Sequence, residues 1–154
     1  MDSKFAALVK HLAPKLVQLL AMPALSNGLL PRSMPRSGIY LFTENGRHLY
    51  VGRSNELRGR YRNHCGATEK GAPFALLLAR EATGRTRASY RTGADSHAGL
   101  MLDPAFAAAF SAAKQRIRAM EFRYVEETDQ NRQALLEIYC AVVLDTPYND
   151  FGTH

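Results

Sequence analysis

Two short apolar runs around a glycine-containing turn constrain the fold of this chain more than any other feature. Residues 38–43 read Gly-Ile-Tyr-Leu-Phe-Thr, and residues 47–51 read Arg-His-Leu-Tyr-Val. The tripeptide Glu44-Asn45-Gly46 separates the two runs. Runs of β-branched and aromatic residues on both sides of such a turn are typical of paired antiparallel strands. The pattern therefore predicts a β-hairpin with strands over 38–43 and 47–51.

The length of the hairpin loop determines which residues face each other. Gly46, as third residue of a three-residue loop, suits the left-handed conformation that such loops require. In that register Thr43 faces Arg47, and Tyr40 faces Tyr50 on the same face of the sheet. A slip of one residue would place the two tyrosines on opposite faces. They are either ordinary cross-strand packing partners or members of one site.

The rest of the chain predicts helices and one further strand. Apolar residues between 5 and 20 follow a helical spacing that predicts an amphipathic helix, bent or interrupted near Pro14. Three prolines and one glycine make 22–37 a linker or an irregular cover. Further helices are expected over 56–64, 73–82, 103–116 and 129–144, a strand over 118–126, and a loop over 84–102.

The composition is that of a globular protein. The chain has 154 residues, of which 46% are hydrophobic and 22% charged, so it is long enough for one domain with its own core. No run reaches the ~18 apolar residues of a membrane helix, and Lys4, Lys10 and Lys15 interrupt the first segment. We therefore expect a helix that packs on the domain, with a membrane-surface helix as the alternative. Cys65 and Cys140 form no metal pattern and predict free thiols in a reducing cytoplasm.

Positive charge is concentrated in one part of the sequence. The net charge is +6, and residues 32–64 hold seven arginines against two glutamates. Residues 124–154 hold six acidic residues against one arginine. A basic hairpin and helix suit a polyanion such as nucleic acid, while the alternative is a solvated arginine-rich face.

Three charged or titratable residues lie in patterns that suggest chemistry. Glu137 is the only charged residue between 134 and 144, in a helix that is apolar on nearly every side and is therefore expected to be mostly buried. Such a carboxylate needs an arginine, a hydrogen-bond cluster or a metal ion, because a lone buried charge is costly. Arg60 and His64 are four residues apart on one predicted helix and hence share a face.

The ordered set of these residues resembles a known signature. Gly38-Ile39-Tyr40, nine intervening residues and then Tyr50-Val51-Gly52 resemble the two motifs of the GIY-YIG nuclease superfamily. Arg60, His64, Glu137 and Asn149 follow in the order and approximate spacing of that family. The resemblance covers residues 38–64 and 117–150. The sequence departs from the pattern by valine in the second motif and by Arg53, where many members carry a lysine or a small residue.

The resemblance implies a small α/β (α+β) fold, with a three-stranded antiparallel sheet flanked by helices. Residues 1–37 would form an N-terminal helix and linker packed on a nuclease domain over 38–154, with a helical insertion before the third strand. It also implies an endonuclease that hydrolyses nucleic-acid phosphodiester bonds, with DNA as the expected partner. One Mg²⁺ or Mn²⁺ ion is expected, because one carboxylate suits one hard cation with water in most of its shell.

The resemblance also implies a role for each residue. Glu137 would bind the metal, Arg60 would stabilise the transition state and His64 would orient or relay a proton. Tyr40 is the first choice for the general base, with Tyr50 as the alternative or as its hydrogen-bonded partner. Asn149 would hold the tyrosines or the last helix in place. Phosphate contacts are expected from Arg47, Arg53, Arg58 and Arg62.

Two other functional classes remain open on the sequence. One is a non-catalytic nucleic-acid-binding module with the same fold. The other is a partner-binding protein that uses its N-terminal helix for oligomerisation. The sequence indicates neither the oligomeric state nor which nucleic acid is bound.

Overall fold

The computed structural model describes residues 1–66, 72–85 and 97–152, which form two compact units. Residues 1–60 and those from 120 onward make up the sheet unit, and residues 61–119 make up the helical unit. Within the described residues, no helix is long and apolar enough to cross a membrane. The proposed division into 1–37 and 38–154 stays a prediction.

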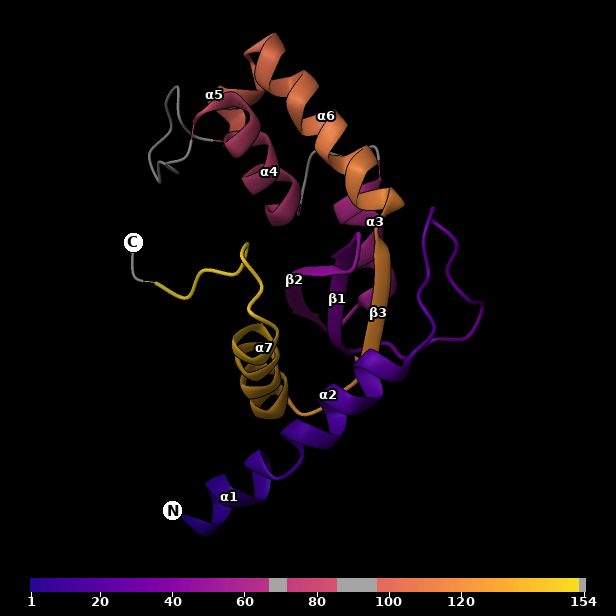
Figure 1. Ribbon diagram of the computed structural model, residues 1–154, viewed down its shortest axis with the longest axis vertical. Helices are drawn as coiled ribbons and strands as arrows, with labels where there is room; N and C mark the ends of the chain where they lie inside the picture. The colour runs from indigo at the N-terminus through magenta and orange to yellow at the C-terminus, as the bar shows by residue number, and fades with distance from the viewer. Residues whose placement is uncertain (67–71, 86–96, 153–154) are drawn as a thin grey trace. The chain divides into compact units, whose positions relative to one another are not determined.

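The sheet unit is built on three antiparallel strands, as predicted (Figure 1). These are β1 (Gly38–Glu44), β2 (Arg47–Ser54) and β3 (Glu121–Glu126), in the order β2-β1-β3. β1 pairs with both neighbours and is therefore the central strand. The helices that flank this sheet make the fold α+β, as expected from the sequence.

The hairpin between β1 and β2 has a two-residue loop, not the predicted three-residue loop. Asn45 and Gly46 have φ angles of 51° and 77°, and Glu44 pairs directly with Arg47. Two consecutive residues with positive φ are the mark of a type I′ turn, which Asn-Gly sequences favour. The predicted pairing of Thr43 with Arg47 is therefore wrong.

A β-bulge next to the turn changes the register of the rest of the hairpin. Thr43 pairs with His48, but Phe42 pairs with Tyr50, so Leu49 is one extra residue in β2. Beyond the bulge, Tyr40 lies opposite Gly52. The predicted direct pairing of Tyr40 with Tyr50 is thus wrong. Their predicted placement on one face is confirmed, since one extra residue in the bulge replaces one extra residue in the loop.

The core of the sheet unit lies between one face of the sheet and two helices. Figure 1 shows α2 (Leu12–Ala21) and α7 (Gln130–Leu144) beside the sheet. Alternation along the strands points four apolar side chains towards these helices. The core residues are Ile39, Leu41, Val51 and Val125 from the sheet, Leu12, Leu16 and Leu19 from α2, and Leu136 and Cys140 from α7.

The N-terminal segment forms two helices, so the predicted helix is interrupted and not bent. α1 (Ser3–Val9) ends shortly before α2 begins at Leu12. Pro14 lies in the first turn of α2, where a proline is tolerated. In a continuous helix its ring would clash with the carbonyl of Lys10, four positions earlier. Pro14 also has no N–H to donate to that carbonyl. The break near Pro14 was predicted, and it occurs at this point.

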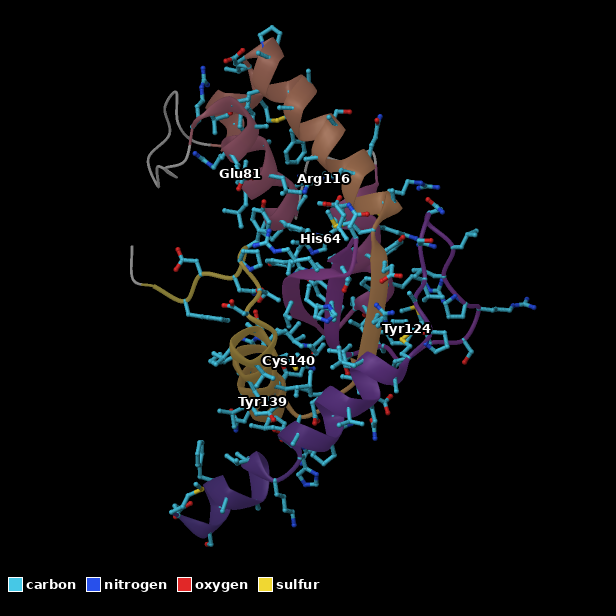
Figure 2. All side chains as sticks on the ribbon, in the orientation of Figure 1. His64, Glu81, Arg116, Tyr124, Tyr139 and Cys140 are labelled. Carbon is cyan, nitrogen blue, oxygen red and sulfur yellow. The ribbon has the colours of Figure 1, made fainter. Side chains whose placement is uncertain are left out.

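Helix α7 begins as predicted but is less buried than predicted. Asp129 caps it, with Oδ1 accepting a hydrogen bond from the Arg132 N–H at 2.8 Å. The side chains of Ile138, Val142 and Val143 are between 46% and 69% exposed. The expectation that α7 is buried on most sides is therefore wrong, because only one stripe of the helix packs inward. That stripe includes Cys140, which is labelled with its neighbour Tyr139 in Figure 2. Both cysteines are free, as expected, and both are buried.

The predicted linker over 22–37 closes the outer edge of β3. Leu25 and Phe122 exchange two main-chain hydrogen bonds, of 2.9 and 2.7 Å. The Met22 carbonyl accepts a further hydrogen bond from Arg123 Nε at 3.0 Å. These bonds satisfy groups of β3 that an open sheet edge would expose to pairing with another chain.

In the part of the helical unit that the structure describes, three helices follow α3. α3 (Leu57–Cys65) begins in the sheet unit, while α4 (Pro73–Thr83), α5 (His97–Met101) and α6 (Pro104–Ala119) belong to the helical unit. Both α4 and α5 pack against α6. The predicted loop over 84–102 is wrong at its end, where α5 forms, and 86–96 lie outside the described residues. The third strand starts at Glu121, not at 118, because α6 continues to Ala119.

Candidate functional site

Two hydrogen-bonded tyrosines form the centre of the candidate site. Tyr40 of β1 is 2% exposed, while Tyr50 of β2 is partly exposed. Their ring centroids are 6.3 Å apart with an interplanar angle of 45°. The Tyr40 and Tyr50 side chains are hydrogen-bonded to each other through their hydroxyls.

Gly52 makes room for this pair. It lies directly opposite Tyr40, and a Cβ atom at Gly52 would overlap the Tyr40 ring and hydroxyl. A glycine is therefore required here by close approach and not by turn geometry. Gly38 is subject to a similar constraint, since a Cβ there would overlap the Val125 carbonyl of β3. Close packing within the sheet thus explains why both motif positions are glycine.

Burial is the main influence on both tyrosines. It raises the pKa of Tyr50 to about 12 and raises the pKa of Tyr40 well above its ordinary value. The negative charge of Glu137 raises the pKa of both hydroxyls further, and the positive charge of Arg60 lowers both. Side chains from β1, β2, α3 and α7 therefore act on one pair of hydroxyls.

Glu137 is paired with an arginine. The Arg53 Nε atom lies 2.9 Å from Glu137 Oε2, and the two side chains are 45% and 21% exposed. Burial raises the pKa of Glu137, while the Arg53 charge and hydrogen bond lower it. Among the partners expected for this carboxylate, the structure thus supplies an arginine. Arg53, expected to contact phosphate, lies on the core-facing side of β2 beside α7.

Asn149 fastens the segment after α7 to the outer edge of β2. Its Oδ1 accepts from the Val51 N–H at 2.8 Å, and its Nδ2 donates to the Val51 carbonyl at 2.7 Å. The preceding Tyr148 N–H donates to the carbonyl of the bulge residue Leu49 at 3.2 Å. Asn149 thereby fixes the strand residues on both sides of Val51, which include Tyr50.

Thr146 was missed by the sequence reasoning. It is buried, and its Oγ1 donates a hydrogen bond to Asn149 Oδ1 at 2.7 Å. This bond fixes the orientation of the amide that pairs with Val51. A hydroxyl residue three positions before the asparagine was the available signal.

The remaining predicted basic residues lie in different surroundings. Arg47 is exposed at the start of β2, where it pairs with Glu44. Arg58 donates to the carbonyls of Pro31 and Arg32, at 2.6 and 3.2 Å, so it holds the linker over the start of α3. Arg62 and the buried His64 belong to the helical unit, and their predicted roles stay predictions.

Glu137 is the carboxylate that could hold a metal ion at this pair. Over 1–66, 72–85 and 97–152, no group of three His, Cys, Asp or Glu side chains is arranged to hold a metal ion. A site with one carboxylate would take its other ligands from water and substrate, as Mg²⁺ sites often do. The carboxylate oxygens of Glu137 fit such an ion by their chemistry, provided that the Arg53 guanidinium moves away.

Comparisons with known proteins give no relative for this chain. No protein-family model, no curated protein and no solved structure matches it.

Proposed function

We propose that this protein is a metal-dependent endonuclease that hydrolyses phosphodiester bonds at the tyrosine pair of the sheet unit. Its substrate is nucleic acid, with DNA as the first expectation. One observation carries the proposal. Tyr40, Tyr50, Arg60 and Glu137 come from four separate elements, and the charges of the last two act on the hydroxyls of the first two. The motifs around these residues resemble those of the GIY-YIG superfamily, which supports the same chemistry.

Tyr50 is the member of the pair that we assign as general base. It is the more exposed tyrosine, so burial disfavours its phenolate less than that of Tyr40. When Tyr50 ionises, the Tyr40 hydroxyl can donate its hydrogen bond to the phenolate and stabilise it. Tyr40, sequence reasoning's first choice, then acts as the donor that positions and stabilises Tyr50.

Arg60 and Glu137 would have different electrostatic roles: Arg60 would stabilise negative charge, and Glu137 would hold a cation. The Arg60 fork can donate to phosphate oxygens as negative charge develops, and its charge favours the ionised Tyr50. Glu137 would hold one Mg²⁺ or Mn²⁺ ion. When bound, such an ion supplies Lewis-acid stabilisation of the leaving oxygen and a positive charge near the phosphate.

A purely structural role does not account well for Glu137. Its ion pair with Arg53 is partly exposed, because the arginine is 45% exposed. Pairs in such surroundings contribute roughly 0–1 kcal/mol to stability. Burial meanwhile disfavours the charged carboxylate. A partly buried glutamate that contributes little to stability is better explained by a function.

The alternative is a nucleic-acid-binding module without turnover. The Arg53–Glu137 ion pair favours it, because an arginine occupies the carboxylate that a metal ion would need. The two functions differ in whether a covalent bond is broken. They therefore make different predictions for the same assay.

A nicking assay tests the proposal directly. Plasmid, branched and single-stranded DNA are incubated with the protein in Mg²⁺, in Mn²⁺ and in EDTA. We expect cleavage that requires the metal and is lost in Glu137→Gln. Glu121→Gln is the matched control, since Glu121 also pairs with an arginine, Arg123, at 3.2 Å, but lies outside the site. Binding without cleavage in any metal would support the binding module and overturn the enzyme.

A further inference from the structure

The Arg53–Glu137 pair lies at the junction of the second motif with α7. Arg53 follows Gly52 directly in β2, and its register partner is Ile39. Its side chain therefore lies on the sheet face that carries the core, next to α7, while Tyr50 belongs to the opposite face of the same strand. Arg53 is thus one residue away from the glycine on which Tyr40 packs.

The contact that holds the pair is short, but its arginine is partly exposed to solvent. Nε lies 2.9 Å from Oε2, which is the distance of a charge-assisted hydrogen bond. Arg53 is 45% exposed, so its guanidinium can leave Glu137 without crossing a packed core. Glu137 is only 21% exposed, so it would remain near the site with a partly desolvated charge. The arginine is therefore the mobile partner of the two.

A divalent cation and Arg53 cannot share this carboxylate oxygen. Both are positively charged, and a cation at Glu137 would repel the guanidinium at short distance. A guanidinium displaced from Glu137 has a new partner in a substrate phosphate bound at the metal ion, because its fork of donors matches phosphate oxygens.

We propose that Arg53 is an exchangeable counter-ion of Glu137, which competes with the metal ion for the carboxylate and moves to a phosphate of the substrate when the metal binds. This inference rests on the proposed function, since it assumes that Glu137 is a metal ligand. It assigns Arg53 a positioning role. Metal and phosphodiester binding become coupled, and by linkage each must tighten the other by the same factor.

Mn²⁺ titration of the metal-free protein, followed by electron paramagnetic resonance, tests the competition without any cleavage. We expect Arg53→Gln to bind Mn²⁺ at least roughly tenfold more tightly than wild type, because the competing charge is gone. Arg47→Gln is the matched control, since it removes one positive charge from an exposed position on the same strand. Arg53→Lys keeps a competing charge and is expected to bind Mn²⁺ more weakly than Arg53→Gln.

The coupling is tested with dimethyl phosphate, a singly charged phosphodiester, in the same titration. We expect it to tighten Mn²⁺ binding to wild type and to have little effect in Arg53→Gln. Equal Mn²⁺ affinity in Arg53→Gln and Arg47→Gln, with both variants folded by thermal melting, overturns the exchange. If Glu137→Gln binds Mn²⁺ as wild type does, the metal site itself is wrong and the proposed function fails with it. Loss of Mn²⁺ binding in Glu137→Gln with no effect of Arg53 overturns the exchange alone.

Discussion

The side-chain amide of Asn149 pairs with both main-chain groups of Val51, as a neighbouring strand would. β2 is an outer strand of the sheet over the described residues, so this amide supplies the hydrogen-bond partners that a further strand would supply. Val51 lies between Tyr50 and Gly52. The pairing therefore holds the second motif in place from outside the sheet, 98 residues away in the sequence.

Asn149→Ala should destabilise the protein and loosen the second motif. It removes the two hydrogen bonds with Val51 and the one from Thr146, and it leaves the Val51 groups at the strand edge, at an expected cost of about 1–3 kcal/mol in the free energy of unfolding. Urea unfolding measures this cost, and amide hydrogen exchange at Val51 should accelerate. Asn131→Ala, at an exposed position on α7, is the control. An Asn149→Ala protein with wild-type exchange at Val51 would contradict this account.

Gly52→Ala should destabilise the protein through Tyr40. The new methyl group would overlap the Tyr40 ring, and overpacking of this kind costs about 1–3 kcal/mol. The cost should shrink when Tyr40→Ala is present as well, which a double-mutant cycle measures by urea unfolding. Gly59→Ala is the control, because a Cβ there would lie 3.8 Å from Glu56 Cβ in ordinary contact. A cost of Gly52→Ala that is independent of Tyr40 would show that the backbone is the cause.

Alkaline pH should weaken the fold through Tyr50. Its pKa in the folded state is about 12, against about 10 when unfolded, so folding binds its proton more tightly. The stabilisation is present below pH 10 and is lost as the pH rises towards 12. Wild type should therefore lose about 1 kcal/mol more than Tyr50→Phe between pH 8 and pH 11 in urea unfolding. Tyr139→Phe, outside the pair, should behave like wild type; equal losses in wild type and Tyr50→Phe would rule out this origin.

Arg47 and Arg58 should affect nucleic-acid binding differently. Arg47 is exposed, so Arg47→Gln should reduce the salt dependence of binding by roughly 0.9 in the log–log slope on duplex DNA, if it contacts one phosphate. Arg58 is engaged by two carbonyls of the linker. Arg58→Gln should instead lower the free energy of unfolding by about 1–2 kcal/mol with little change in slope. A reduced slope in Arg58→Gln would show that Arg58 releases the linker to bind phosphate.

Arg60→Lys should separate cleavage from binding. It keeps the charge but loses the planar fork that matches phosphate oxygens. We expect the cleavage rate to fall by roughly 10²-fold or more, and the dissociation constant to change much less. Arg62→Lys, on the same helix, is the comparison. Equal losses in rate and affinity would reduce Arg60 to an anchor.

Local patterns predicted the elements of this fold well. The hairpin, the Asp129 cap and the break near Pro14 each depend on a few adjacent residues, and the structure contains all three. The exposed side of α7 was not predictable in this way, because apolar residues such as Val142 appear the same in sequence whether covered or not.

The details of the candidate site depend on long-range geometry that the sequence does not encode locally. The bulge at Leu49 cannot be recognised from its residue type, since leucine also occurs in regular strands. The Arg53–Glu137 contact joins residues 84 positions apart, and the spacing of the motifs predicts neither residue's partner. Charge type alone therefore assigned Arg53 to phosphate, while packing placed it against α7.

The bulge at Leu49 has a consequence for how the hairpin tolerates insertions and deletions. The side of β2 on which Tyr50 emerges depends on whether the number of residues separating it from Tyr40 is odd or even, and loop and bulge residues count equally. A variant with one more residue in the turn and without the bulge residue Leu49 would keep the two tyrosines on one face. Losing Leu49 alone would turn Tyr50 away from Tyr40 and break their hydrogen bond. Geometry therefore constrains whether the spacing between the two motifs is odd or even, while the turn within that spacing is free to change.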